Sequence, residues 1–155
     1  MKINDQLIIA LLRENSRMTL TKMSKKTSIP VSTLYQRLKS YKEGIVKKHT
    51  ALVDFNKLGF TARARVLLKV DKKKKEDLRK HLLTSQFTNE LHKVNNGYDF
   101  MAELIFKSMK ELEAYVDTLD EKFSIKEKKT FYIVDEIKEE GFLSKPDLIK
   151  IGENL

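Results

Sequence analysis

The 155-residue chain contains no cysteine. This absence excludes a disulfide scaffold, a thiolate zinc site and a cysteine nucleophile together. No apolar run approaches the roughly 20 residues that a membrane helix needs, and the first residues (MKINDQLIIALL) lack the cleavage pattern of a signal peptide. We therefore expect a soluble, cytoplasmic protein that has no membrane partner.

Signatures of catalysis are also scarce. The three histidines, His49, His81 and His92, show no metal-ligand spacing, and the chain has neither a G-x-G-x-x-G motif nor a phosphate loop. Each histidine is explained as a satisfied or solvent-facing side chain. The paired acids lie among lysines and are typical of surface charge. The sequence thus predicts no enzyme activity, no catalytic residue, no metal site and no cofactor.

The basic residues are concentrated at one end of the chain. Residues 1–50 contain 11 lysines and arginines and 3 acids, a net charge of +8. The other 105 residues contain 20 basic and 19 acidic groups, a net charge of +1. Evenly spread lysines would indicate only a solvated surface. Their segregation onto one module favours a polyanionic partner, which is either nucleic acid or an anionic membrane.

The first fifty residues show the periodicity of three helices. Segment 5–14 places apolar side chains on one helical stripe, and Asp5 is positioned to cap its start. Thr19 can cap a short second helix, on which Leu20 and Met23 face inward and the lysines face outward.

A third helix is expected to begin near Pro30, because proline is tolerated in the first turn of a helix but not in its interior. Gly44 ends this helix, and its buried face has helical spacing: Leu34, Leu38 and Tyr41. Two helices joined by a tight turn, the second rich in polar and basic side chains, predict a helix-turn-helix.

The second helix of such a motif enters the major groove with its N-terminal part. Gln36 can pair bidentately with adenine, and Arg37 with guanine or with a phosphate. The candidate base contacts are Val31, Ser32, Thr33, Tyr35, Gln36 and Arg37. The candidate phosphate contacts, which set register and affinity without reading sequence, are Lys22, Lys25, Lys26, Lys39, Lys47 and Lys48. The alternative is that these are exposed polar residues of an ordinary packing helix.

The rest of the chain alternates between strand and helix patterns. Strands are expected at 62–70, near 87–95, at 98–106 and at 125–137, with helices at about 74–84 and 108–121. The resulting order, βαββαβ, is the ferredoxin-like arrangement, in which helices cover one face of a sheet. The fold class is therefore α+β.

Local signals support this order. Ser108 and Glu111 form a capping box at the start of the second helix of the repeat, whose apolar stripe comprises Met109, Leu112, Val116 and Leu119. The strand at 98–106 presents Tyr98, Phe100, Ala102, Leu104 and Phe106 on one face. Asn95-Asn96-Gly97 forms the turn between the two halves, because asparagine and glycine adopt a positive φ at low cost.

We divide the chain into a helix-turn-helix domain at 1–49, a linker at 50–61, the βαββαβ domain at 62–138 and a tail at 139–155. The linker has the pattern of an extended connector that ends in a turn at Leu58-Gly59. The tail carries scattered apolar residues, and their docking partner cannot be read from the sequence.

Over residues 4–138 the chain resembles the Lrp/AsnC family, the feast/famine regulators of bacteria and archaea. The resemblance depends on LLRENSR (11–17), on the hydrophobic spacing of 32–54, on DFNKLG (54–59) and on GYD (97–99) before an alternating strand. The most specific part is Gly44-Ile45-Val46 followed by Thr50-Ala51-Leu52-Val53-Asp54.

The resemblance implies properties that the residues alone did not indicate. The N-terminal module would bind double-stranded DNA, and a strand within the linker would connect it to the βαββαβ domain, which is RAM/ACT-like. That domain would dimerise through its sheet, and dimers would assemble into tetramers or octamers. The protein would be nucleoid-associated.

The resemblance also implies an effector, an amino acid or related metabolite, bound near the turn at 95–97. The corresponding residues are Asn96, Gly97, Asp99 and, across the site, Thr130. The family pattern is commonly G-x-Y-D, whereas this chain has Asn96-Gly97-Tyr98-Asp99, so the glycine is displaced by one position. The alternative for this segment is a purely structural turn.

Three functions compete at this stage. The first is a transcription regulator that binds pseudo-palindromic sites as a dimer or larger assembly. The second is an architectural, chromatin-like protein with little sequence preference, which is favoured by the predominance of lysine, at 25 of 31 basic residues. The third is a small-molecule sensor or metabolic subunit in which the basic module is incidental.

Overall fold

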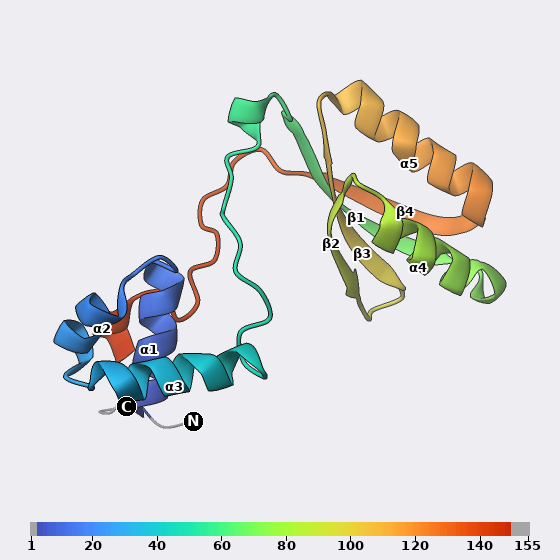
Figure 1. Cartoon of the computed structure of the whole chain (residues 1–155). Coiled ribbons are helices and arrows are strands. Elements are labelled where there is room, and N and C mark those ends of the chain that lie inside the picture. The colour runs from blue at the N-terminus through green and yellow to red at the C-terminus, as the bar shows by residue number, and fades with distance from the viewer. Residues whose placement is uncertain (1–2, 150–155) are drawn as a thin grey trace. The chain divides into compact units, whose positions relative to one another are not determined.

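The computed structural model describes residues 3–149, and these form two compact units (Figure 1). The head unit contains residues 3–52 together with 137–149, and the sheet unit contains residues 53–136. The C-terminal tail therefore belongs to the same unit as the N-terminal helices. Among the described residues, no helix is both long and apolar enough to cross a bilayer.

The head unit is built from four helices: α1 (Ile3–Glu14), α2 (Leu20–Thr27), α3 (Val31–Lys42) and the short α6 (Pro146–Ile149). The core between the first three is apolar and is centred on Ile8, Leu11, Met23, Leu34 and Tyr41. Leu20 and Leu38 are partly buried against this core. The expected inward faces of the second and third helices are therefore confirmed.

The turn between α2 and α3 is set by local chemistry. The Thr19 hydroxyl accepts a hydrogen bond from the backbone N–H of Lys22 at 3.3 Å, which confirms Thr19 as the N-cap of α2. Ser28 ends α2 in the left-handed conformation, with φ of 57°. Pro30 then occupies the N-cap position of α3. Its fixed φ and missing N–H suit this position, where the backbone donor would have no helical partner.

The expected role of Asp5 as a cap is wrong. Because α1 already begins at Ile3, Asp5 lies inside its first turn. Its carboxylate instead accepts hydrogen bonds from Arg37 and Tyr41 of α3. A tertiary partner 32 residues away has outweighed the local capping preference.

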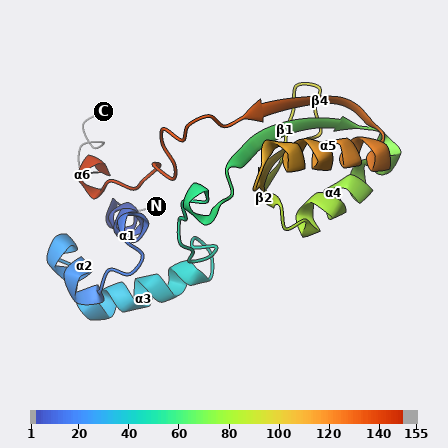
Figure 2. The ribbon, with the colours of Figure 1, turned by 90° about the horizontal axis from the view of Figure 1, so that it is seen from above.

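The tail packs against α1 within the head unit, as the views of Figures 1 and 2 both show. Arg13 donates from Nε to the carbonyl oxygen of Phe142 at 2.7 Å and from Nη2 to the carboxylate of Glu140 at 2.6 Å. Glu140 and Leu143 both have a positive φ, of 48° and 49°. These contacts give the tail a docking partner that its own scattered apolar residues did not indicate.

The linker at 50–61 does not contain the expected strand. Its ordered part is a 3₁₀ helix, η1 (Asn56–Leu58), after which Gly59 turns the chain at φ of 85°. The Asp54 carboxylate accepts from the backbone N–H groups of Asn56 and Lys57. A strand needs a hydrogen-bonded neighbour, and the sheet of this chain consists of four other segments. Leu52 therefore remains 62% exposed.

The sheet unit has the expected βαββαβ order. Its strands are β1 (Ala62–Val70), β2 (Thr88–Lys93), β3 (Phe100–Phe106) and β4 (Ile125–Tyr132). Its helices are α4 (Lys75–Thr84), preceded by the 3₁₀ turn η2 (Lys72–Lys74), and α5 (Met109–Phe123). The four strands are antiparallel in the order β2-β3-β1-β4.

Both helices cover the same face of the sheet (Figure 2). The covered face of β1 is buried from Ala62 to Val70 at every second residue, and on β3 Phe100, Ala102, Leu104 and Phe106 are buried. Leu112, Val116 and Leu119 of α5 pack onto this core. Met109 does not, being 47% exposed, because it is the first residue of α5 and lies beyond the edge of the core.

Three strands are shorter than expected, and the first of them, β2, covers Thr88–Lys93 instead of about 87–95. β3 begins at Phe100 rather than at Tyr98, because the chain is still leaving the turn at Asn96 and Gly97. β4 ends at Tyr132 rather than at 137, near the start of its neighbour β1 at Ala62. Beyond that point the strand runs out of partner, and Val134 is 98% exposed.

Candidate DNA-binding surface and ligand site

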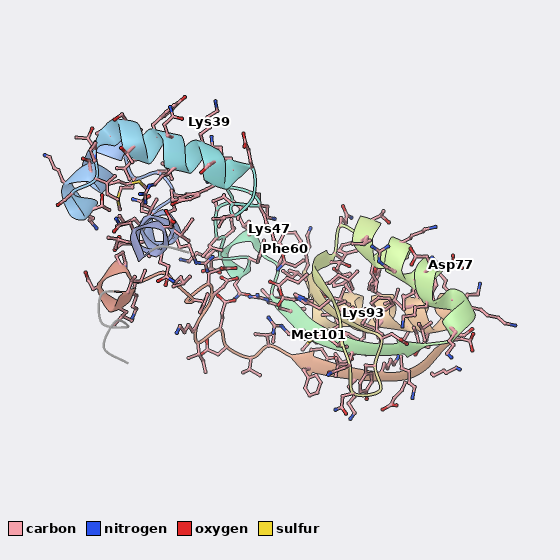
Figure 3. The ribbon with its side chains drawn as sticks, turned by 90° about the horizontal axis from the view of Figure 1, so that it is seen from below. Lys39, Lys47, Phe60, Asp77, Lys93 and Met101 are labelled. Carbon is pink, nitrogen blue, oxygen red and sulfur yellow. The ribbon has the colours of Figure 1, made fainter. Side chains whose placement is uncertain are left out.

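The N-terminal half of α3 presents an exposed surface. Tyr35 is 58% exposed and Val31 is 43% exposed, although both are large and apolar or aromatic. Ser32, Gln36 and Lys39 are exposed on the same helix, and Figure 3 labels Lys39 there. The opposite side of α3 is used for packing through Leu34 and Tyr41. This exposed set can contact a groove without disturbing the core.

Two of the six candidate base contacts differ from the rest. Thr33 is half-buried. Arg37 is also half-buried, and its Nη1 donates to Oδ1 of Asp5 at 2.9 Å. Its charge is therefore partly neutralised within the head unit. Side-chain type alone could not separate Arg37 from Gln36, because the separation depends on Asp5, which belongs to another helix.

The six candidate phosphate contacts all lie in the head unit and are all exposed. Lys22, Lys25 and Lys26 are on α2, Lys39 is on α3, and Lys47 and Lys48 follow α3. Lys26 pairs with Glu14 at 3.2 Å, a surface contact of small energy. These cations flank the helix pair that contains the exposed α3 surface, so the charge and the candidate reading surface occur in one unit.

The candidate effector segment is a tight turn between β2 and β3. Asn96 and Gly97 have φ of 59° and 87°, which confirms that both residues adopt the left-handed conformation. Asp99 follows, and its Oδ2 accepts from the backbone N–H of Val70 at 3.0 Å while its Oδ1 accepts from Lys75. The Asp99 carboxylate thus joins the end of β1 to the start of α4.

The charge state of Asp99 follows from these contacts. Burial alone would raise the pKa of its carboxyl group. The hydrogen bonds from Lys75 and from the Val70 amide outweigh burial, and the pKa lies below its ordinary value. Asp99 is therefore an anion whose oxygens already have donors in this chain.

The structure does not bring Thr130 to this turn. Thr130 pairs with Val66 on one side of β1, whereas the Asp99 backbone N–H bonds to Leu68 on the other side. β1 therefore lies between the two residues. Of the four candidate effector residues, Asn96, Gly97 and Asp99 are gathered by one turn, and Thr130 is separate.

Sequence reasoning missed a charged network on the face of the sheet that the helices leave open. Glu103 of β3 is 2% exposed. Its carboxylate accepts from Arg63 at 2.9 Å, from Arg65 at 3.2 Å and from the Asn89 amide at 2.7 Å. Burial would raise the pKa of Glu103, but the bonds from Asn89, Arg63 and Arg65 lower it below its ordinary value. The signal was present in the alternation of Arg63 and Arg65 along β1.

Sequence reasoning also missed a basic pocket of about 570 Å³ in the sheet unit. The pocket lies between α4 and the β2–β3 end of the sheet, and its lining includes Lys72, Lys75, Arg79 and Lys93. Its visible signal was the lysine run at 72–75. In the part of the chain that the structure describes, histidines and acids form no group able to hold a metal ion.

Comparison with protein families gives two matches along the chain. A family described as "Lrp/AsnC ligand binding domain" matches residues 63–143, and one described as "Winged helix-turn-helix DNA-binding" matches residues 1–46. The first match covers the four-stranded sheet and its two helices. The second covers α1, α2 and α3.

Individual proteins are similar as well. The HTH-type transcriptional regulator FL11 of Pyrococcus furiosus is 30% identical over 114 residues, 73% of this chain and 76% of that protein. FL11 of Pyrococcus abyssi is 28% identical over 116 residues, 74% of this chain and 77% of that protein.

Solved structures share the fold at lower identity. The transcriptional regulator NMB0573 of Neisseria meningitidis, in complex with L-Met, has a TM-score of 0.82 at 20% identity, covering 90% of this chain and 93% of that one. LrpC of Bacillus subtilis has a TM-score of 0.79 at 21% identity, covering 89% and 96%. With a helical DNA-binding region followed by a matched ligand-binding domain, the chain belongs to the Lrp/AsnC family of transcription regulators, which are not enzymes.

Proposed function

We propose that this regulator binds pseudo-palindromic duplex sites as a homodimer or larger homo-oligomer, in response to an amino acid or related metabolite. The observation that carries the proposal is the exposed surface of α3 within a region of net charge +8. In a symmetric dimer, two such surfaces read half-sites one helical turn or a multiple apart.

For base reading we propose the exposed set Val31, Ser32, Tyr35 and Gln36, with Thr33 and Arg37 at its margin. The Gln36 amide suits adenine, and the Tyr35 ring offers an apolar surface for a thymine methyl group. Arg37 contributes a contact to the DNA backbone, with a charge that its pair with Asp5 partly neutralises. The six head-unit lysines supply the phosphate contacts.

Dimerisation is proposed through the open face of the sheet. That face carries the Glu103 network, and Ile105 on it is 9% exposed. Phe131 on β4 is 55% exposed on the same side as Arg65, its cross-strand partner. Aromatic residues such as phenylalanine, and arginine, are enriched at protein interfaces relative to the rest of the surface. Tetramers or octamers of such dimers would strengthen DNA binding through effective concentration.

For the effector we propose the turn residues Asn96, Gly97 and Asp99, with Thr130 as a separate contact from beyond β1. The relative NMB0573 was crystallised with L-Met, which supports an amino acid as one ligand class. The proposed divisions of the chain remain 1–49, 50–61, 62–138 and 139–155. Because the tail packs on α1, we propose that residues 139–155 support the DNA-binding module.

The decisive experiment enriches random duplexes on the full-length protein and then measures affinity for the selected site and for random DNA at several salt concentrations. We expect two half-sites with two-fold symmetry and a specificity ratio of about a thousand or more. A ratio near one would instead show an architectural, low-specificity protein. No duplex binding even at low salt would contradict both functions and favour a sensor with an incidental basic module.

A further inference from the structure

The basic pocket of the sheet unit combines two chemically different walls. One wall consists of cations that come from η2, α4 and the end of β2: Lys72, Lys75, Arg79 and Lys93. The other is apolar and consists of Leu83, Leu91 and Phe100, of which Phe100 is 4% exposed and belongs to the core. The single carboxylate of the lining is Glu76.

Two of the four cations already have partners. Arg79 pairs with Glu76 at 3.0 Å, one helical turn away on α4, and Lys75 donates to Asp99. Within the described part of the chain, Lys72 and Lys93 make no ion pair, and both are exposed. The pocket therefore presents, beside its apolar wall, two ammonium groups that make no ion pair with any described residue.

This charge balance selects among ligands of similar shape. A carboxylate in the pocket gains attraction from Lys72 and Lys93. An α-ammonium group would lie among the same cations and would meet only Glu76, whose charge is shared with Arg79. For an amino acid, repulsion of its ammonium group therefore offsets part of the electrostatic attraction that its carboxylate gains. An anion that has the same apolar chain and no ammonium group loses nothing.

We propose that this pocket binds a small monocarboxylate with an apolar body and no ammonium group, in preference to the corresponding zwitterionic amino acid. The inference rests on the proposed ligand-responsive function and names a second ligand class and place for it. The volume of about 570 Å³ lies within the range of small-molecule sites. Lys72 and Lys93 bind the carboxylate, and Leu83, Leu91 and Phe100 contact the chain.

The pocket also adjoins the effector turn through one side chain. Lys75 lines the pocket, donates to Asp99 and lies 5.9 Å from the centre of the Phe100 ring. An anion beside Lys75 competes with Asp99 for its protons. Asp99 also accepts a hydrogen bond from the Val70 amide. A ligand in the pocket therefore alters the contacts of Asp99 with the end of β1 and with the turn that follows β2.

The test uses a matched pair of probes, L-methionine and its 2-oxo analogue 4-methylsulfanyl-2-oxobutanoate, titrated calorimetrically into the full-length protein. The two probes share their carboxylate and their chain and differ only in the ammonium group. We expect the 2-oxo acid to bind about tenfold or more tightly than methionine. The Lys72→Gln/Lys93→Gln variant should weaken its binding by about tenfold or more, and the Lys110→Gln variant on exposed α5 should not.

Each of the following outcomes overturns the proposal. Methionine binding that is tighter than that of the 2-oxo acid and that is weakened in the Lys72→Gln/Lys93→Gln variant contradicts the ligand class. So does the absence of binding of either probe at millimolar concentration. If inorganic phosphate binds as tightly as the 2-oxo acid and displaces it, the apolar wall contributes nothing to the affinity. Unchanged affinity in the double variant moves the site elsewhere.

DNA affinity without ligand, measured on the same preparations, separates the two levels of the argument. If the titrations contradict ligand binding in the pocket while the protein still binds DNA, the proposed function is retained. Loss of DNA binding in the unmodified protein contradicts the proposed function itself.

Discussion

Asp5 on α1 accepts, at a single oxygen, a hydrogen bond from Arg37 at 2.9 Å and another from Tyr41 at 2.6 Å. Both donors lie on α3, one turn apart, so one carboxylate fixes the orientation of that helix relative to α1. The orientation of the exposed α3 surface therefore depends on a carboxylate that belongs to another helix.

We predict that Asp5→Asn weakens the packing of α3 on α1. An amide keeps an acceptor but loses the charge that holds Arg37, and we expect a loss of about 1–2 kcal/mol in the partly buried contact. Hydrogen exchange should then rise in α1 and α3 and remain unchanged in β1 and β3. Glu14→Gln, which removes an exposed pair with Lys26, is the matched control and should have little effect. Equal exchange in both variants would contradict the assigned role of Asp5.

Tyr41 makes the same contact sensitive to alkaline pH. Burial, together with its bond to Asp5, raises the pKa of Tyr41 from 10.0 to about 12. A group whose pKa is raised on folding stabilises the protein fully below the unfolded value. We therefore expect its contribution to be present below pH 10.0 and to disappear between pH 10.0 and about 12. Tyrosinate absorbance should show a late phase that includes Tyr41, and Tyr41→Phe should reduce the amplitude of that phase by one tyrosine.

Base-reading and phosphate-binding residues should differ in their salt dependence. Gln36→Ala should weaken binding to the selected site by about 1–3 kcal/mol and leave affinity for random duplex nearly unchanged, because the lost bonds are to base edges. Competition binding with the two duplexes measures this ratio. A uniform loss on both duplexes would make Gln36 a backbone contact instead.

Lys22 and Lys25 should contribute to the affinity for every duplex, whatever its sequence. Replacing both with glutamine should weaken binding to every duplex and reduce the slope of log affinity against log salt by about 2, since each phosphate contact contributes about 0.9. Lys107→Gln/Lys110→Gln removes the same charge from the exposed surface of the sheet unit and serves as the control. An unchanged slope in the Lys22/Lys25 variant would remove them from the DNA surface.

Glu103 should govern the stability of the sheet unit in acid. Its pKa lies below the ordinary value, so its contribution is present above that value and is lost as pH falls through the folded pKa. Glu103→Gln leaves Arg63 and Arg65 without their shared anion, and we expect a loss of about 2–3 kcal/mol at neutral pH. Urea unfolding across acidic pH should show a flatter profile in this variant. Glu113→Gln on the exposed side of α5 is the control.

Much of the fold was predictable because its signals are local. The cap at Thr19, the start of α3 after Pro30, the alternation along β1 and the two positive φ values at Asn96 and Gly97 each depend on a few neighbouring residues. Propensity and sterics decide such features wherever the segment lies in the molecule.

The misplaced features depend on partners that are distant in the sequence. The linker strand fails because no neighbouring strand of this chain pairs with it. The predicted cap at Asp5 fails because its carboxylate binds partners on α3, and the same contact separates Arg37 from Gln36. The basic pocket draws its lining from two helical segments and two strands, so no single stretch of sequence displays it.

The contact between Arg13 and Phe142 spans 129 residues of chain. The whole sheet unit is therefore a loop inserted between two pieces of the head unit, and closing that loop carries the entropic cost of ordering its ends. During synthesis, α1, α2 and α3 leave the ribosome long before the segment that docks on α1. The part of the protein that meets DNA is thus the last to be completed, after its sheet unit has had time to fold.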